Sequence, residues 1–140
     1  YSRYRFEDAV LRRRKEEFMG AAELCRIMLQ AQADSYGDGL DSALRHPYMW
    51  LCKSHYYGST FYNFPYAFGG LFARGLYAKY AQEGASFVPI YKKLLHTTTV
   101  ATAEDAAKVA GIDLTDKEFW LSALAEVEEK IDMFCALVEL

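Results

Sequence analysis

The sequence predicts an all-α fold, on two kinds of evidence. Apolar residues recur at helical spacing in several separate segments, and capping residues or glycines mark where those segments begin and end. The 140 residues (16.0 kDa) suit one domain or one lobe of a larger one, and 52% hydrophobic residues can supply a core. We therefore expect a multi-helix unit spanning residues 1–140.

The first predicted helix covers residues 4–18, and its apolar side carries Phe6, Val10 and Leu11. The basic run at residues 12–15 could indicate nucleic-acid binding or a solvated helix face. Glu16 and Glu17 follow it directly and the chain has a net charge of −3. We therefore favour the solvated face and expect no nucleic-acid partner.

The second predicted helix covers residues 21–36, after a break at Met19-Gly20 and before a glycine-containing turn at residues 36–39. Its core-facing stripe consists of Leu24, Cys25, Met28 and Leu29. The aromatic-rich segment 46–61 has no helical or alternating period. We expect it to be irregular but well packed.

The third predicted helix begins in the segment Tyr62-Asn63-Phe64-Pro65, because Asn63 can cap free backbone N–H groups and proline suits a first turn. It runs to about Glu83 and stops at Gly84. Arg74 and Lys79 interrupt its apolar face, so it is not membrane-spanning. On one side, the small residues Gly69, Gly70 and Ala73 would let another backbone approach closely.

Three further elements complete the predicted fold. Ser86 caps a short helix through Leu95, and residues 96–99 form a loop. A helix starting at residues 102–105 ends at Gly111. Thr115 or Asp116 then caps a helix of about twenty residues, whose inward side chains are Phe119, Trp120, Leu124, Val127 and Ile131.

Few patterns in the chain indicate catalysis. The three histidines are not four residues apart, so there is no HExxH helix, and no Cys/His cluster has zinc-ligand spacing. No GxSxG motif or phosphate-binding loop is present. The three cysteines are widely separated, which predicts reduced, mostly buried thiols in a cytoplasmic protein. The opening residues do not resemble a signal peptide.

One group of residues remains as a candidate site. His55 precedes Tyr62 and Tyr66, which are four apart and share a face if the helix begins early. These side chains could line a cleft and donate hydrogen bonds. Alternatively, they are core aromatics with satisfied hydroxyl groups.

The segment HPYMWLCKSHYYGSTFYNFPYAFGGLFARGLYAKY, residues 46–80, resembles the region downstream of the zinc site in the oligoendopeptidase F family, relatives of thimet oligopeptidase. The blocks LCRIMLQAQADSYGD, KYAQEGASFVPIYKKLL and AGIDLTDKEFW resemble flanking parts of that family. The resemblance therefore covers nearly the whole chain. It implies the C-terminal helical part of a cytoplasmic zinc peptidase that hydrolyses short peptides.

In that family the zinc ligands and the glutamate that activates the zinc-bound water lie upstream of the matched region. The resemblance thus implies zinc in the full-length enzyme and none bound by this chain, which we expect to be inactive without the missing N-terminal portion. By motif position, Tyr66 and His55 take catalytic roles at the oxyanion, and His55 and Tyr62 bind substrate. The pair Gly69-Gly70 departs from the family, which often has another tyrosine there.

Two alternatives come from other functional classes. The chain could be a non-catalytic helical module that binds peptides or a partner protein. It could also expose an apolar cleft face and form a homodimer through it.

Overall fold

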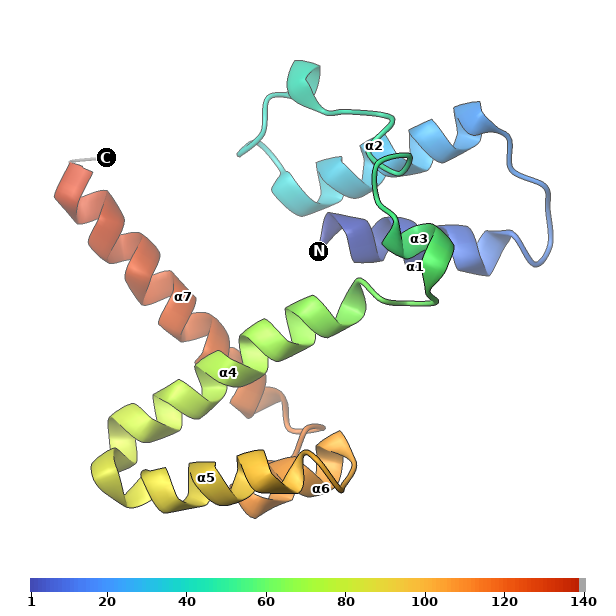
Figure 1. Ribbon diagram of the computed structural model, residues 1–140. Coiled ribbons are helices and arrows are strands. Elements are labelled where there is room, and N and C mark those ends of the chain that lie inside the picture. Colours follow the sequence, from blue (N-terminus) through green and yellow to red (C-terminus); the bar gives the residue numbers. More distant parts are fainter. Residues whose placement is uncertain (139–140) are drawn as a thin grey trace. The chain divides into compact units, whose positions relative to one another are not determined.

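A computed structural model describes residues 1–138 (Figure 1). Helices and their connections make up this range, and no β-strand occurs within it. The prediction of an all-α fold is confirmed. The chain forms two compact units, the first ending at Ala67 and the second beginning at Phe68.

The first unit contains the helices α1 (Ser2–Arg13) and α2 (Ala21–Tyr36), which lie side by side (Figure 1). They enclose a core of four buried residues: Phe6, Ile27, Met28 and Ala31. The predicted bounds of α2 are confirmed, and Met28 from its predicted stripe is fully buried. The first helix, however, ends at Arg13 rather than at residue 18. Phe18 is 96% exposed, so a longer helix would bury no additional apolar surface there.

A 3₁₀ turn, η1 (Ser42–Leu44), and the four-residue helix α3 (His55–Gly58) complete the first unit. The prediction that residues 46–61 are largely irregular is confirmed. The prediction that they are well packed is wrong for several large side chains, which are substantially exposed: Tyr48, Leu51, Tyr57 and Phe61.

The second unit contains most of α4 (Phe64–Glu83), the 3₁₀ helix η2 (Gly84–Phe87), α5 (Val88–Thr97), α6 (Ala103–Val109) and α7 (Lys117–Val138). Its core consists of Leu76, Phe87, Leu94, Ala107, Ala110 and Ile112. Gly84 and Gly111 have positive φ angles of 66° and 67°. Both therefore end helices in a conformation that favours glycine, as predicted.

Two predicted helix starts are confirmed, and a side chain accepts a backbone hydrogen bond at each of them. The Thr102 side chain accepts a hydrogen bond from the Asp105 backbone N–H at the start of α6, and the Asp116 carboxylate accepts one from Glu118 in α7. The prediction for Ser86 is wrong. Ser86 lies within η2, where its hydroxyl donates to the Glu83 carbonyl. Helix α5 therefore begins later, at Val88. It also extends to Thr97, a residue that was predicted to lie in a loop.

The inward face of α7 is shorter than predicted. Phe119 and Trp120 are partly buried and Ala123 is fully buried. Leu124 and Ile131 are about half exposed, so their prediction as inward residues is wrong. Helical spacing shows which residues share a face, but it cannot show how far a neighbouring element extends along that face.

Close helix contact in the second unit occurs at a glycine that was not predicted. A Cβ atom added to Gly75 would lie 2.5 Å from the Cε2 and Cζ atoms of Phe119, so α4 and α7 touch there. Gly69 and Gly70 would meet no atom within 4 Å. The predicted close approach at these two glycines is therefore wrong, and the partner at Gly75 is an aromatic ring rather than a backbone.

The three cysteines are more accessible than predicted, and the described helices are not suited to span a membrane. Cys52 is exposed and Cys25 and Cys135 are half-buried, so the prediction of mostly buried thiols is wrong. Among the helices of residues 1–138, none combines the length and apolar character needed to cross a bilayer.

Candidate functional site

His55, Tyr62 and Tyr66, the three residues singled out in the sequence, lie together in the first unit. His55 Nε2 and Tyr66 Oη are 3.1 Å apart, within hydrogen-bond distance. The His55 and Tyr62 rings stack with centroids 4.9 Å apart, and the Tyr62 and Tyr66 rings meet edge to face at 6.0 Å. We call these three residues the His–Tyr cluster.

The position of His55 depends on the neighbouring residues of α3. The Tyr56 hydroxyl donates a 3.1 Å hydrogen bond to the Arg3 carbonyl, and its ring packs against Phe6 with centroids 5.1 Å apart. The Tyr57 hydroxyl donates to the Trp50 carbonyl at 3.1 Å. Tyr56 therefore anchors α3 to α1, and Tyr57 ties it to the preceding segment.

A strained residue precedes the two tyrosines of the cluster. Phe61 has a φ angle of 54°, in the left-handed region that side chains with a Cβ atom rarely adopt. Such a conformation costs about 1–2 kcal/mol, which the surrounding structure must offset. It lies between α3 and α4, where the chain turns and brings Tyr62 and Tyr66 back to His55.

Hydrogen bonding favours one tautomer of His55. Its Nδ1 atom is buried and has no hydrogen-bond partner in the described part of the chain. A buried N–H without an acceptor costs about 1–3 kcal/mol, and orphaned N–H groups are rarer than under-used acceptors. We therefore assign the proton to Nε2, which donates to Tyr66 Oη. This assignment leaves the Tyr66 O–H free to donate to another molecule.

The cluster is accessible from solvent. Tyr66 is 60% exposed, Tyr62 is also exposed, and His55 is partly buried. The alternative that these are core aromatics does not fit this exposure. The Lys53 ammonium lies 5.3 Å from the Tyr66 ring centroid, a cation–π contact that places a positive charge beside the cluster. The surroundings therefore favour an electron-rich ligand atom near Tyr66.

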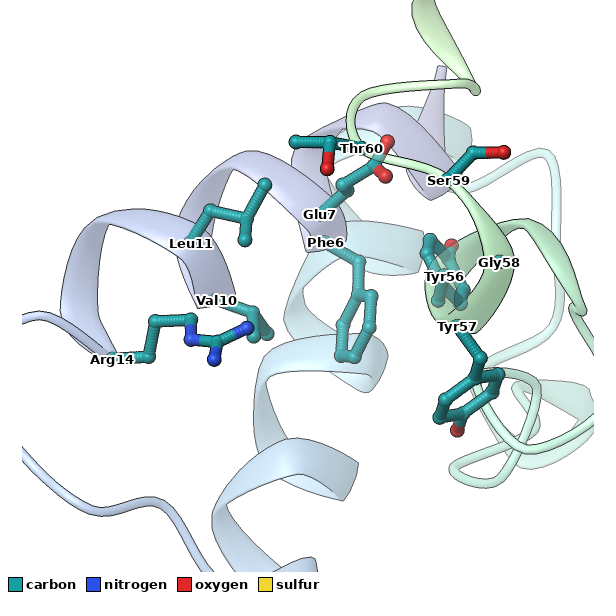
Figure 2. A pocket seen from close by; sticks show the side chains of 10 residues that line it. All are labelled: Phe6, Glu7, Val10, Leu11, Arg14, Tyr56, Tyr57, Gly58, Ser59 and Thr60. Atoms are coloured by element: carbon teal, nitrogen blue, oxygen red, sulfur yellow. The ribbon is translucent and has the colours of Figure 1, made fainter.

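A pocket of about 360 Å³ lies in the same unit, between α1 and residues 56–60 (Figure 2). It is lined by Phe6, Glu7, Val10, Leu11, Arg14, Tyr56, Tyr57, Gly58, Ser59 and Thr60. Tyr56 and Tyr57 directly follow His55, so α3 contributes to both the pocket and the His–Tyr cluster. Burial and, to a lesser degree, the Glu7 carboxylate raise the pKa of the Tyr56 phenol, which therefore stays neutral.

Sequence reasoning missed this pocket. A signal was present, because Glu7, Val10, Leu11 and Arg14 follow the i, i+3, i+4, i+7 spacing of one helix face. Two opposite charges on an otherwise apolar face are unusual. The prediction of a solvated face concerned residues 12–17 and left out Glu7, which is buried.

We also tested whether the zinc ion implied by the resemblance fits these residues. Across residues 1–138, no three His, Cys, Asp or Glu side chains gather closely enough to hold a metal ion. The Nε2 atom of His55 already lies within hydrogen-bond distance of Tyr66 Oη. The described residues thus do not provide a zinc site.

The fold and the cluster define an all-α chain with an accessible set of histidine and tyrosine hydrogen-bond donors. The chain is similar to an oligoendopeptidase F homolog from Mycoplasma pneumoniae, to which it is 29% identical over 79 residues. The match covers 56% of this chain and 13% of that protein, so the chain spans a small part of its relative's length. No family model and no solved structure matches. The comparison shows a distant relation to this homolog.

Proposed function

We propose that this chain is part of a peptidase and supplies hydrogen-bond donors that bind a peptide and stabilise the transition state of its hydrolysis. The observation that carries the proposal is the 3.1 Å contact between His55 Nε2 and Tyr66 Oη in an accessible cluster. The distant relation to an oligoendopeptidase F homolog supports the choice of peptide hydrolysis. Short peptides are the proposed substrates.

The proposed chemistry follows from the charge that develops during hydrolysis. When water attacks a peptide carbonyl, negative charge builds up on its oxygen. A donor held in place beforehand stabilises that charge, and removing one such donor typically costs 10²–10³ in kcat. Tyr66 takes this role because its O–H is free when His55 donates to its oxygen. The Lys53 ammonium beside the ring adds favourable electrostatics.

His55 and Tyr62 would act in binding. His55 holds the Tyr66 hydroxyl in position, and its ring stacks on Tyr62. Tyr62 presents an exposed aromatic surface against which a peptide can lie. Residues outside the described part of the chain would have to hold the implied zinc ion, because the described residues do not fit it.

The test is Tyr66→Phe in the longer protein that contains this chain. We expect kcat for a short fluorogenic peptide to fall about 100-fold or more, with little change in thermal stability because the side chain is exposed. Tyr36→Phe is the matched control: Tyr36 is also an exposed tyrosine of the first unit, it lies outside the cluster, and its loss should leave kcat unchanged.

The kinetic pattern separates the roles within the cluster. Tyr62→Ala should raise KM more than it lowers kcat, because it removes the aromatic surface that binds substrate and transition state alike. An unchanged kcat for Tyr66→Phe would remove Tyr66 from the oxyanion role. Peptide binding without turnover in the longer protein would favour the alternative of a non-catalytic binding module.

A further inference from the structure

The pocket between α1 and residues 56–60 has the features of a ligand site separate from the His–Tyr cluster. We propose that it binds a short zwitterionic peptide, with the peptide's ammonium group at Glu7 and its carboxylate at Arg14. This inference does not depend on the proposed hydrolytic function, because it rests on the pocket's own charges, burial and lining.

Glu7 is the main evidence for an ammonium ligand. The residue is only 5% exposed, and its Oε2 atom accepts a 3.0 Å hydrogen bond from Asn63 Nδ2. Within residues 1–138 it has no ion pair with a cation. A carboxylate can accept several hydrogen bonds, and burying one without a cationic partner is costly. An ammonium group in the pocket would supply both the missing charge and the missing donors.

Arg14 provides the opposite charge at the other end of the same wall. It lies seven residues after Glu7 and directly follows the last residue of α1 in a helical backbone conformation, so the two residues are about 10 Å apart along the axis. Figure 2 shows the Arg14 side chain extending along the pocket beside Val10, with Glu7 near Thr60. Arg14 also has no ion pair among the described side chains. No ion pair joins Glu7 to Arg14 among the described side chains, so both charges remain available to a ligand.

The size and lining of the pocket fit two or three amino acid residues. An extended chain rises about 3.3–3.6 Å per residue, so a di- or tripeptide spans about 7–11 Å between its charged ends. A volume of about 360 Å³ lies in the range typical of small-ligand sites. Phe6, Val10 and Leu11 offer apolar surface for a ligand side chain, and Ser59 and Thr60 bring hydroxyl groups for its peptide bond.

A purely structural role for Glu7 predicts a different effect of its substitution on ligand binding. The bond to Asn63 joins residues 56 positions apart, and this could be its sole purpose. In that case Glu7→Gln would have little effect on any ligand. The variant separates the two roles, because the glutamine carbonyl oxygen can still accept from Asn63 while the negative charge is lost.

The experiment is isothermal titration calorimetry of the 140-residue chain with leucylglycine as the probe. Two analogues remove one charge each: N-acetyl-leucylglycine and leucylglycine amide. The variants are Glu7→Gln and Arg14→Gln. Asp38→Asn and Lys15→Gln are matched controls, because both residues are charged and lie outside the pocket lining. Circular dichroism checks that every variant remains folded.

The expected result is a charge-specific pattern rather than a general loss of binding. Leucylglycine should bind about tenfold or more tightly than either analogue. Glu7→Gln should remove the difference between free and acetylated peptide, and Arg14→Gln the difference between free acid and amide. The two controls should bind like the unaltered chain. Absence of binding at millimolar peptide, or equal affinity for all three compounds, would overturn the proposal.

Discussion

Replacing Gly75 by alanine tests the packing of α4 against α7 most directly. The added Cβ atom would lie 2.5 Å from two ring atoms of Phe119, whereas carbon atoms normally approach to about 3.5–4.0 Å. The ring must therefore move by about 1 Å. It cannot do so freely, because it packs against Phe72 at 5.7 Å and Trp120 at 5.1 Å between centroids.

The size of the effect follows from two opposing contributions. Overpacking of this kind lowers the free energy of unfolding by about 1–3 kcal/mol, and the higher helix propensity of alanine raises it by about 1 kcal/mol. Gly70→Ala in the same helix gains the same propensity but meets no atom within 4 Å. The propensity contributions cancel in the comparison. Gly75→Ala should thus be about 1–3 kcal/mol less stable than Gly70→Ala.

The assay is urea unfolding monitored by tryptophan fluorescence in a Trp50→Phe background, so that the signal comes from Trp120 in the second unit. Both glycine variants are compared in this background. Equal stability of the two variants, or a more stable Gly75→Ala, would refute the packing of Phe119 on this glycine.

Two further predictions concern the core and the pH dependence of stability. Leu94→Ala should lower the free energy of unfolding by about 2–5 kcal/mol, because Leu94 is fully buried in the core of the second unit. Leu121→Ala, at an exposed position of α7, should lower it far less. Similar losses for the two variants in urea unfolding would contradict this prediction. Hydrogen bonds from Arg26 and, to a lesser degree, from Arg13 lower the pKa of Glu23 from 4.5 to about 2. The contribution of the Glu23 carboxylate to the stability of the fold is therefore complete above pH 4.5 and disappears as the pH falls towards 2. The difference in melting temperature between the unaltered chain and Glu23→Gln should accordingly shrink from pH 6 to pH 2.5, and a constant difference would show that these ion pairs do not stabilise the fold.

Local sequence determined most of the helices. The bounds of α2, the end of α4 and the start of α6 follow from periodicity, capping side chains and glycines with positive φ. These features act within one or two turns, so the residues nearby are sufficient to predict them. The spacing of Tyr62 and Tyr66 likewise indicated a shared face.

The tertiary structure alone decided which of these faces meet. The buried contact between Glu7 and Asn63 joins residues far apart in the chain, and the contact between His55 and Tyr66 spans a segment that contains the left-handed residue Phe61. Two of the five predicted inward residues of α7, Leu124 and Ile131, are exposed, because the described part of the chain leaves them uncovered. Periodicity identifies an apolar face from local geometry, but burial depends on which distant segment packs against it.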